Sequence, residues 1–176
     1  MEESAEVRTT EQLTALASLD ALFEHHGLDY WLFGGWAVDF WVGAVTRPHD
    51  DVDLAVWRDD YPEIRQLLEQ AGWRYEPVDD EAIGAGFRSG AVLLEFTFVV
   101  SDADGQIFIP FSGGPGLWST ELFDDQRFEL SGVTCRIVPR AFLMAGKAEP
   151  REDEPDAAKD RADFAALSAA TGQQPT

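Results

Sequence analysis

The stretch Phe33-Gly34-Gly35-Trp36-Ala37-Val38-Asp39, followed closely by Thr46-Arg47-Pro48-His49-Asp50-Asp51-Val52-Asp53, decides the fold of this chain. The apolar run 30–33 predicts a short buried strand, and the pattern from Trp36 to Val42 predicts a helix that stops at Gly43. A glycine pair between strand and helix lets backbone N–H groups approach a phosphate closely. Tight packing of the strand against the helix would explain the same glycines.

The second half of this stretch predicts a strand, residues 51–57, with two carboxylates on one face. Asp51 and Asp53 point to the side opposite Val52 and Leu54, which face the core. Two such carboxylates repel each other unless a cation lies between them, and Mg²⁺ takes oxygen ligands while keeping sites for water and phosphate. Together with the glycine pair, they predict a site for a metal-bound nucleoside triphosphate. A solvated turn and edge strand is the alternative.

A third carboxylate, Glu95, is the only acid in the apolar run 91–100, which predicts another strand. Alternation places Glu95 on one face with Leu93 and Thr97. If this strand lies beside residues 51–57, the three carboxylates converge, and such a cluster can hold two metal ions about 3.5–4 Å apart. The exposed face of a half-buried strand would also explain Glu95.

Other phosphate and metal motifs are absent from the sequence. The glycine pair fits neither GxxxxGK[ST] nor GxGxxG, so the P-loop and dinucleotide-binding interpretations fail. The histidines and the single Cys135 have no zinc-ligand spacing. Cys135 lies in an alternating apolar run, which predicts a packed thiol.

The remaining pattern predicts an α+β fold in one domain, 1–176, with a catalytic core over about 10–138 and a C-terminal helical segment over about 139–170. The predicted helices and strands outside the two motifs alternate with glycine- and proline-rich turns. They are a helix from Thr9 to Gly27, a helix over 61–70, strands over 106–111, 127–130 and 133–138, a helix over 139–147, an exposed loop over 148–156, a helix over 157–170 and a frayed tail over 171–176.

The formal net charge is −20, from 33 acidic and 13 basic residues. Such a surface repels nucleic acid and anionic membranes and attracts a small amine-rich substrate, although solubility alone would also explain it. Residues 1–6 contain three glutamates and no apolar run, so no signal peptide is expected. The apolar region 30–45 is too short and broken to span a bilayer, and we expect a cytoplasmic protein.

The two motifs resemble the signature of the polymerase-β-like nucleotidyltransferases and, more narrowly, that of the small aminoglycoside and lincosamide nucleotidyltransferases, which confer antibiotic resistance. The close match covers about residues 30–57. A weaker match covers Val138 to Leu167, where Lys147, Lys159-Asp160 and Asp163 fit the family pattern. The resemblance implies a palm-like mixed sheet flanked by helices, with further helices at the C-terminus.

The resemblance also implies a reaction and its residues. A hydroxyl of a small, cationic acceptor, with an aminoglycoside as best candidate, would attack the α-phosphate of ATP or another nucleoside triphosphate and release pyrophosphate. Asp51, Asp53 and Glu95 would be catalytic and bind Mg²⁺, expected as two ions, with Glu95 a ligand, a general base or both. The residues implied to bind the nucleotide are Gly34, Gly35, Arg47, Lys147 and Lys159.

Several alternatives stay open at this stage. The acceptor could be a lincosamide, or a protein or tRNA in a toxin–antitoxin system, although the negative charge disfavours tRNA. The chain could also be a non-catalytic nucleotide-binding module, and either a monomer or a small homo-oligomer. Arg47 is predicted to contact phosphate or, with slight preference, to pair with Asp39. Trp118 is a candidate lid, although an anchor for its glycine-rich loop is the favoured interpretation.

Two positions depart from the family pattern. Glu95 stands where the aminoglycoside branch often has aspartate, and its longer side chain shifts the carboxylate. Ala157 stands where the family often has an arginine, two residues before the Lys-Asp pair. Arg151 is the candidate to replace that arginine.

Overall fold

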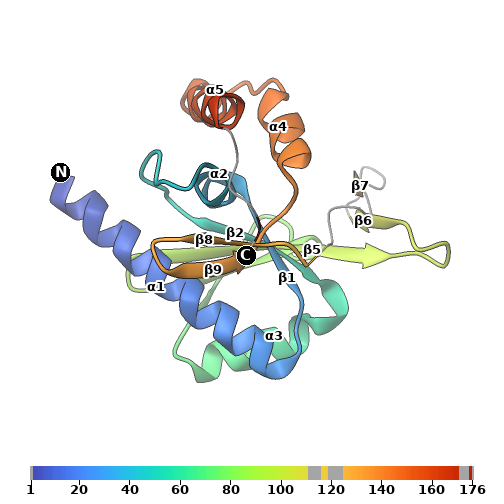
Figure 1. Ribbon diagram of the computed structural model, residues 1–176. Helices are drawn as coiled ribbons and strands as arrows, with labels where there is room; N and C mark the ends of the chain where they lie inside the picture. The colour runs from blue at the N-terminus through green and yellow to red at the C-terminus, as the bar shows by residue number, and fades with distance from the viewer. Residues whose placement is uncertain (1, 111–115, 119–124, 171–174, 176) are drawn as a thin grey trace.

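A mixed sheet runs through the middle of the molecule, with helices on both of its faces (Figure 1). The computed structural model describes residues 2–110, 116–118, 125–170 and 175. In chain order the elements are α1 (Glu2–His26), β1 (Tyr30–Phe33), α2 (Gly34–Val42), β2 (Val52–Trp57), the 3₁₀ helix η1 (Arg58–Asp60), α3 (Tyr61–Gln70), β3 (Arg74–Glu76), β4 (Gly84–Ser89), β5 (Val92–Ser101), β6 (Ile107–Ile109), β7 (Gly116–Trp118), β8 (Arg127–Leu130), β9 (Val133–Arg136), α4 (Arg140–Ala148) and α5 (Glu154–Ala169).

The main sheet has the strand order β1-β2-β5-β4-β3, and β6 and β7 extend it from the end of β5. The β2–β5 pair is parallel, whereas the other strand pairings of the described residues are antiparallel. In the parallel register Asp53 lies opposite Glu95 and Leu54 opposite Phe96. This pairing was the condition for the three carboxylates to converge, and the structure fulfils it.

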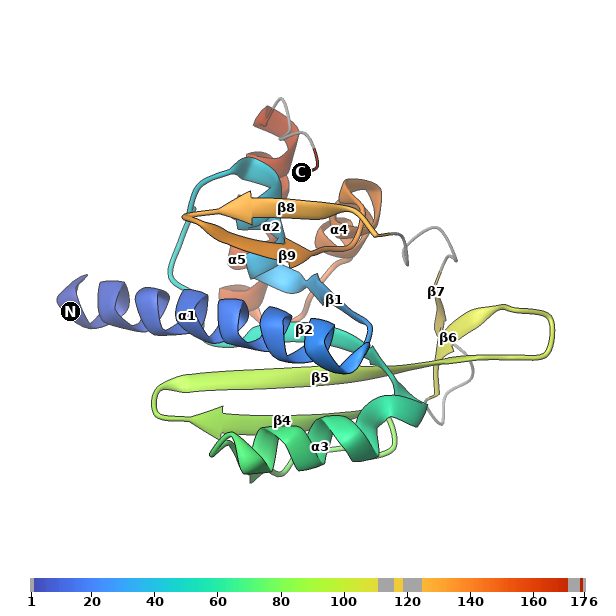
Figure 2. The same ribbon diagram turned by 60° about the horizontal axis from the view of Figure 1, so that its bottom comes forward.

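The helices divide between the two faces of the sheet. Figures 1 and 2 show α1 and α3 on one face and α2, α4 and α5 on the other. The apolar residues predicted to face inward, among them Leu54 on β2 and Leu94 on β5, are fully buried, and α1 adds Leu16 and Phe23 to the same core. The β8–β9 hairpin packs against α1, and Cys135 within it is buried, as predicted.

The α+β class and most predicted elements are confirmed. The strands over 30–33 and 127–130 and the helix over 61–70 have the predicted bounds. Glu95 points away from the buried face formed by Leu94 and Phe96, as the alternation required. Within the described part of the chain, no helix is long and apolar enough to cross a membrane.

Two predicted helix starts were wrong. The first helix begins at Glu2, not Thr9, because the Thr10 hydroxyl donates to the Glu6 carbonyl inside the helix instead of capping it. The last helix begins at Glu154, inside the predicted loop, because the Asp153 side chain accepts from the Asp156 N–H and caps it.

Strands β3, β4 and β7 were not predicted, and β7 lies where a glycine-rich loop was expected. β4 contains Gly84 and Gly86, and glycine is unfavourable in strands. A Cβ at Gly84 would lie 2.4 Å from the carbonyl oxygen of Phe96 on β5, so close backbone approach explains this glycine. The predicted tail 171–176, apart from position 175, and the Trp118 side chain lie outside the described residues.

We expect Leu54→Ala to lower the free energy of unfolding by about 2–5 kcal/mol, because it leaves a cavity in the core beside β2. Urea denaturation measures this change. Val7→Ala is the matched control: the Val7 residue is 53% exposed, so its truncation should change the unfolding free energy by less than about 0.5 kcal/mol. Equal effects of the two substitutions would contradict the placement of β2 in the core.

Candidate active site

A pocket of about 490 Å³ lies between the sheet and the C-terminal helices. Its walls come from the β1–α2 junction, the loop 43–51, β2, β5, α4 and α5. All of the residues predicted for the site line it, although they are spread over most of the chain: Gly34, Gly35, Arg47, Asp51, Asp53, Glu95, Lys147 and Lys159.

Three carboxylates on the sheet side of the pocket form no ion pair within the described part of the chain. Asp51 directly precedes β2, Asp53 lies on β2 and Glu95 faces it from β5. No Lys, Arg or His among the described residues forms an ion pair with any of these three, whereas Asp50, Asp156 and Asp160 in the same pocket are all paired. The sheet side of the pocket therefore has an uncompensated negative charge.

The proximity of these carboxylates contributes to a raised pKa for two of them. Burial, followed by the charges of Asp51 and Glu95, raises the pKa of Asp53 to about 8, against the opposing effect of Lys147 and Arg151. Partial burial and then Asp51 also raise the pKa of Glu95. A cation bound here would relieve both effects, so the donor set fits a hard divalent ion such as Mg²⁺.

The three carboxylates share the pocket without forming a closed ligand set. In the part of the chain that the structure describes, no group of three or more His, Cys, Asp or Glu side chains is arranged to hold a metal ion. A bound cation would thus have to draw these carboxylates together.

The glycine pair is the first turn of α2, and each glycine faces a side chain of the site. Gly34 has φ = +68°, and a Cβ there would collide with the carboxylate of Asp53. A Cβ at Gly35 would lie 2.5 Å from Nδ1 of His49 and 2.6 Å from Nη2 of Arg47. Close packing of the helix start against these three side chains therefore requires both glycines.

The loop 43–51 is held by buried polar contacts. The Asp39 carboxylate on α2 accepts hydrogen bonds from the backbone N–H and hydroxyl of Thr46, at 3.0 and 2.5 Å, and lies 2.6 Å from Nε2 of His49. Gln12 of α1 donates to the carbonyl of His49 at 3.3 Å. Because Asp51 follows this loop, these contacts help to fix its position.

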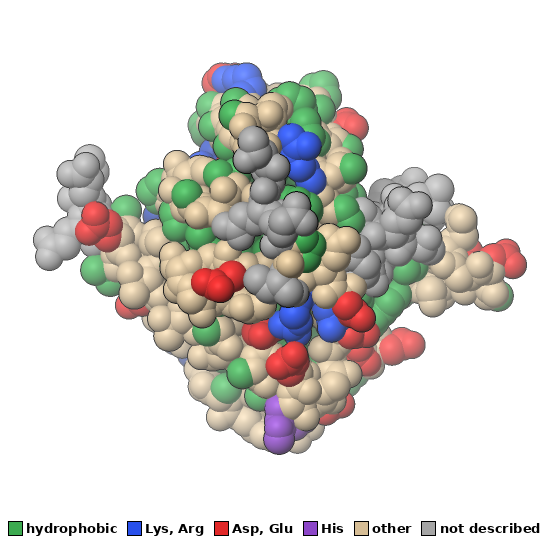
Figure 3. All heavy atoms as spheres, viewed as in Figure 1, with side chains coloured by type: hydrophobic (Ala, Val, Ile, Leu, Met, Phe, Trp, Pro, Cys, Tyr) green, Lys and Arg blue, Asp and Glu red, His purple; other side chains and the backbone are tan. Residues whose placement is uncertain are grey.

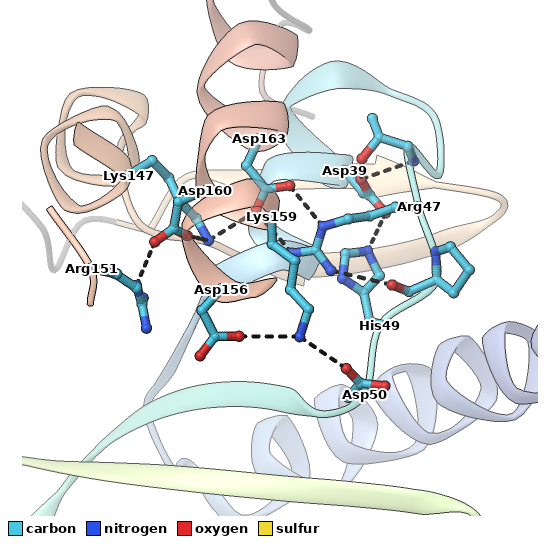
Figure 4. A network of polar contacts seen from close by, with 12 residues as sticks. Asp39, Arg47, His49, Asp50, Lys147, Arg151, Asp156, Lys159, Asp160 and Asp163 are labelled. Carbon is cyan, nitrogen blue, oxygen red and sulfur yellow. Dashed lines mark hydrogen bonds and ion pairs between the residues drawn. The ribbon is translucent and has the colours of Figure 1, made fainter. Parts of the chain in front are cut away.

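The preferred pairing of Arg47 with Asp39 was wrong, because Asp39 already binds Thr46 and His49. Arg47 instead donates from Nε and Nη2 to the two carboxylate oxygens of Asp163 on α5, both at 2.9 Å (Figure 4). Burial alone would raise the pKa of Asp163, but hydrogen bonds from Arg47 and Lys147 outweigh it, and the net shift is downward.

The C-terminal helices and the loop between them place three more cations at the pocket. Nζ of Lys147 on α4 lies 2.8 Å from both Asp160 and Asp163. Arg151, the candidate for the missing family arginine, lines the pocket and pairs with Asp160. Lys159 contacts Asp50 at 3.1 Å and Asp156 at 3.3 Å.

Sequence reasoning assigned no role to His49, Asp50, Asp156, Asp160 or Asp163. A signal was present for the last two: they stand three residues apart on a predicted helix and hence on one face. Their partners, Arg47 and Lys147, could not be found from spacing, because those contacts join distant segments.

Acidic side chains are spread widely outside the pocket as well. On the face shown in Figure 3 they lie mainly over the lower half, with basic side chains beside some of them near the middle. This distribution agrees with the net charge of −20.

We expect Gly34→Ala to destabilise the protein more than Gly27→Ala. Both glycines have positive φ, +68° and +67°, so each alanine carries a backbone strain of about 1–2 kcal/mol. A Cβ at Gly27 meets nothing within 4 Å, whereas one at Gly34 collides with Asp53. Urea denaturation of both variants isolates this collision, and equal losses of unfolding free energy would refute it.

We expect Asp53→Asn to stabilise the metal-free protein at alkaline pH. The folded pKa of Asp53, about 8, lies above its ordinary 3.8, so between these values the folded state holds a proton that the unfolded chain releases. The wild type therefore loses stability as pH rises through this range, and an asparagine does not.

Thermal melting in the presence of a chelator at about pH 5.5 and about pH 8 measures this difference. The advantage of the variant should be small at the lower pH and larger at the higher one, at about 2–4 °C per kcal/mol. A variant that melts below the wild type at both pH values would contradict the raised pKa.

The sequence is similar to a family model and to proteins of known activity. The family model described as aminoglycoside-2''-adenylyltransferase matches residues 15–135. A 2''-aminoglycoside nucleotidyltransferase of Escherichia coli is 37% identical over 65 residues, which cover 37% of each protein. A lincosamide resistance protein of Staphylococcus haemolyticus is 40% identical over 55 residues, 31% of this chain and 34% of the relative. The chain thus aligns with little more than a third of the length of these curated relatives.

Two solved structures share the fold. The lincomycin-bound lincosamide antibiotic adenylyltransferase LnuA superposes with a TM-score of 0.70 at 21% identity, over 86% of this chain and 93% of the other. ANT(2'')-Ia in complex with adenylyl-2''-tobramycin gives a TM-score of 0.65 at 22% identity, over 89% of this chain and 87% of the other. These superpositions show that the chain has the nucleotidyltransferase fold. The family model matches well over half of the length of this chain, and the chain therefore belongs to the aminoglycoside-2''-adenylyltransferase family.

Proposed function

We propose that this protein transfers a nucleotidyl group, AMP from ATP in the first instance, to a hydroxyl of an aminoglycoside. The observation that supports this most strongly is the division of the pocket. Three carboxylates without an ion pair, directly before β2, on β2 and on β5, face a group of cations from α4, α5, the loop between these helices and the loop before β2. Carboxylates for a metal ion on one side and cations for phosphate on the other suit a metal-bound nucleoside triphosphate.

In the proposed reaction the acceptor oxygen bonds to the α-phosphorus while the bond from that phosphorus to the bridging oxygen breaks, and pyrophosphate leaves. Glu95 takes the hydroxyl proton as the general base. Lys147, Arg151 and Lys159 bind the phosphates. Mg²⁺, held by Asp51, Asp53 and Glu95, would supply charge neutralisation on the phosphates.

The acceptor proposal depends on charge and on the relatives. An aminoglycoside carries several amino groups, and the protein has an excess of 20 negative charges to attract it. A lincosamide is the second candidate, favoured by the likeness to the lincosamide resistance protein.

The test combines the protein with Mg²⁺, each of four nucleoside triphosphates and a panel of aminoglycosides and lincosamides. Pyrophosphate release and the mass of the acceptor are followed together. We expect a gain of one nucleotidyl group on an aminoglycoside. Modification of lincosamides alone would make a lincosamide, and not an aminoglycoside, the acceptor. The absence of pyrophosphate release with every pair of nucleotide and antibiotic would refute nucleotidyl transfer to these antibiotics.

We expect Asp51→Asn, Asp53→Asn and Glu95→Gln each to lower kcat by about 10²–10⁴-fold, because each removes a metal ligand or the proton acceptor. Asp59→Asn is the matched control, since it removes an exposed acid in η1, outside the pocket, and should keep the wild-type rate. A wild-type rate in any of the three pocket variants would exclude the role given to that residue.

Raising the Mg²⁺ concentration separates the two roles of Glu95. Partial recovery of the Glu95→Gln rate at high Mg²⁺ indicates a metal ligand, because weaker metal binding is overcome by mass action. A rate that stays low at saturating Mg²⁺ indicates the general base.

A further inference from the structure

The cations at the pocket come from separate parts of the chain. Arg47 belongs to the loop before β2, Lys147 to α4, Arg151 to the loop between α4 and α5, and Lys159 to α5 (Figure 4). Backbone structure does not set the spacing between side chains on such different segments. Something else must hold them in one array in the absence of a bound anion.

Two carboxylates of α5, Asp160 and Asp163, make the contacts that join these segments. Asp163 binds the Arg47 guanidinium through both oxygens at 2.9 Å and the Lys147 amino group at 2.8 Å. Asp160 binds the same amino group at 2.8 Å and also the guanidinium of Arg151. Lys147 thus bridges the two acids, and three cations are held by two carboxylates.

The acids that pair with pocket cations differ sharply in exposure. The side chains of Asp160 and Asp163 are 6% and 1% exposed, whereas those of Asp50 and Asp156, which pair with Lys159, are 62% and 45% exposed. Water and salt screen the exposed pairs and scarcely reach the buried ones. An arriving anion can therefore displace the partners of Lys159 much more easily than those of Lys147 and Arg47.

The buried pairs leave capacity for an anion. Two of the three N–H groups of Lys147 are used by Asp160 and Asp163, and the third has no hydrogen-bond partner among the described residues. Three cations against two carboxylates also leave one surplus positive charge within this cluster of five residues.

We propose that Asp160 and Asp163 are positioning residues that preassemble Arg47, Lys147 and Arg151 into a binding array for the triphosphate of the donor, while Lys159 exchanges its contact with Asp156 for one with phosphate. The inference rests on the proposed nucleotidyl transfer and deepens it. Its physical basis is preorganisation, since cations already fixed by buried partners lose less conformational freedom when the anion binds.

Substitution by asparagine distinguishes positioning from simple charge. Each Asp→Asn change removes a negative charge near the pocket, and charge alone would make every such variant bind an anion more tightly. If these acids act by positioning, Asp160→Asn and Asp163→Asn should instead weaken anion binding, because the cations that they hold lose their fixed geometry. Asp156→Asn should still bind the anion more tightly, because the exposed Asp156 competes with phosphate for Lys159.

The experiment titrates the full chain with magnesium tripolyphosphate and with MgATP, without acceptor, by isothermal calorimetry. We expect Asp160→Asn and Asp163→Asn to weaken binding on the order of tenfold and Asp156→Asn to strengthen it severalfold. Glu154→Gln is the matched control, since its exposed pair with Arg161 lies on the same helix outside the pocket, and it should bind as the wild type does. Thermal melting of each variant shows that it is folded.

Tripolyphosphate binding by folded Asp160→Asn that equals or exceeds that of the wild type would overturn the proposal. If Asp163→Asn does not fold, Asp160→Asn decides alone. A crystal structure of the wild type with magnesium tripolyphosphate gives a test without variants: the Lys147 contacts with Asp160 and Asp163 should persist, and their loss would also overturn it. A wild type that does not bind tripolyphosphate or MgATP refutes both this inference and the proposed function, whereas binding unchanged in both variants refutes the inference alone.

Discussion

The parallel pairing of β2 with β5 is the constraint on which the site depends. In this register Asp53 and Glu95 are direct neighbours on one face, while Leu54 and Phe96 pack on the other. A slip of one residue would turn the carboxylates toward the core and the apolar side chains toward the pocket. The same burial that stabilises the sheet thus fixes where the negative charges lie, and the helices α4 and α5 place positive charges opposite them.

Local patterns explain why much of the fold could be predicted. Strand 30–33 is a continuous apolar run and helix 61–70 has strong apolar periodicity, and the bounds of both follow from these patterns. The failures arose where a side chain used a partner that the pattern does not reveal. Thr10 bonds within its helix instead of capping it, and the two glycines of β4 conceal a strand that the neighbouring β5 stabilises through pairing.

The candidate site also has a part that could be predicted from the sequence and a part that could not. The glycine pair and the carboxylates could be identified because each is a short motif, and resemblance to a family joined them. The partner of Arg47 could not be identified, because the choice between Asp39 and Asp163 depends on how α5 packs, and Asp39 is already occupied by Thr46 and His49. The catalytic and binding roles of the residues that line the pocket stay predictions until activity is measured.

The contact between Arg47 and Asp163 spans 116 positions of the sequence, and β1 is hydrogen-bonded to Val138 just before α4. Closing such long loops costs conformational entropy that only contacts made late can recover. During synthesis, which proceeds from the N-terminus, the sheet with its carboxylates can form before α5 has left the ribosome. The nascent chain would then hold the acidic half of the pocket without its cations, so the pocket is completed only after α5 has emerged.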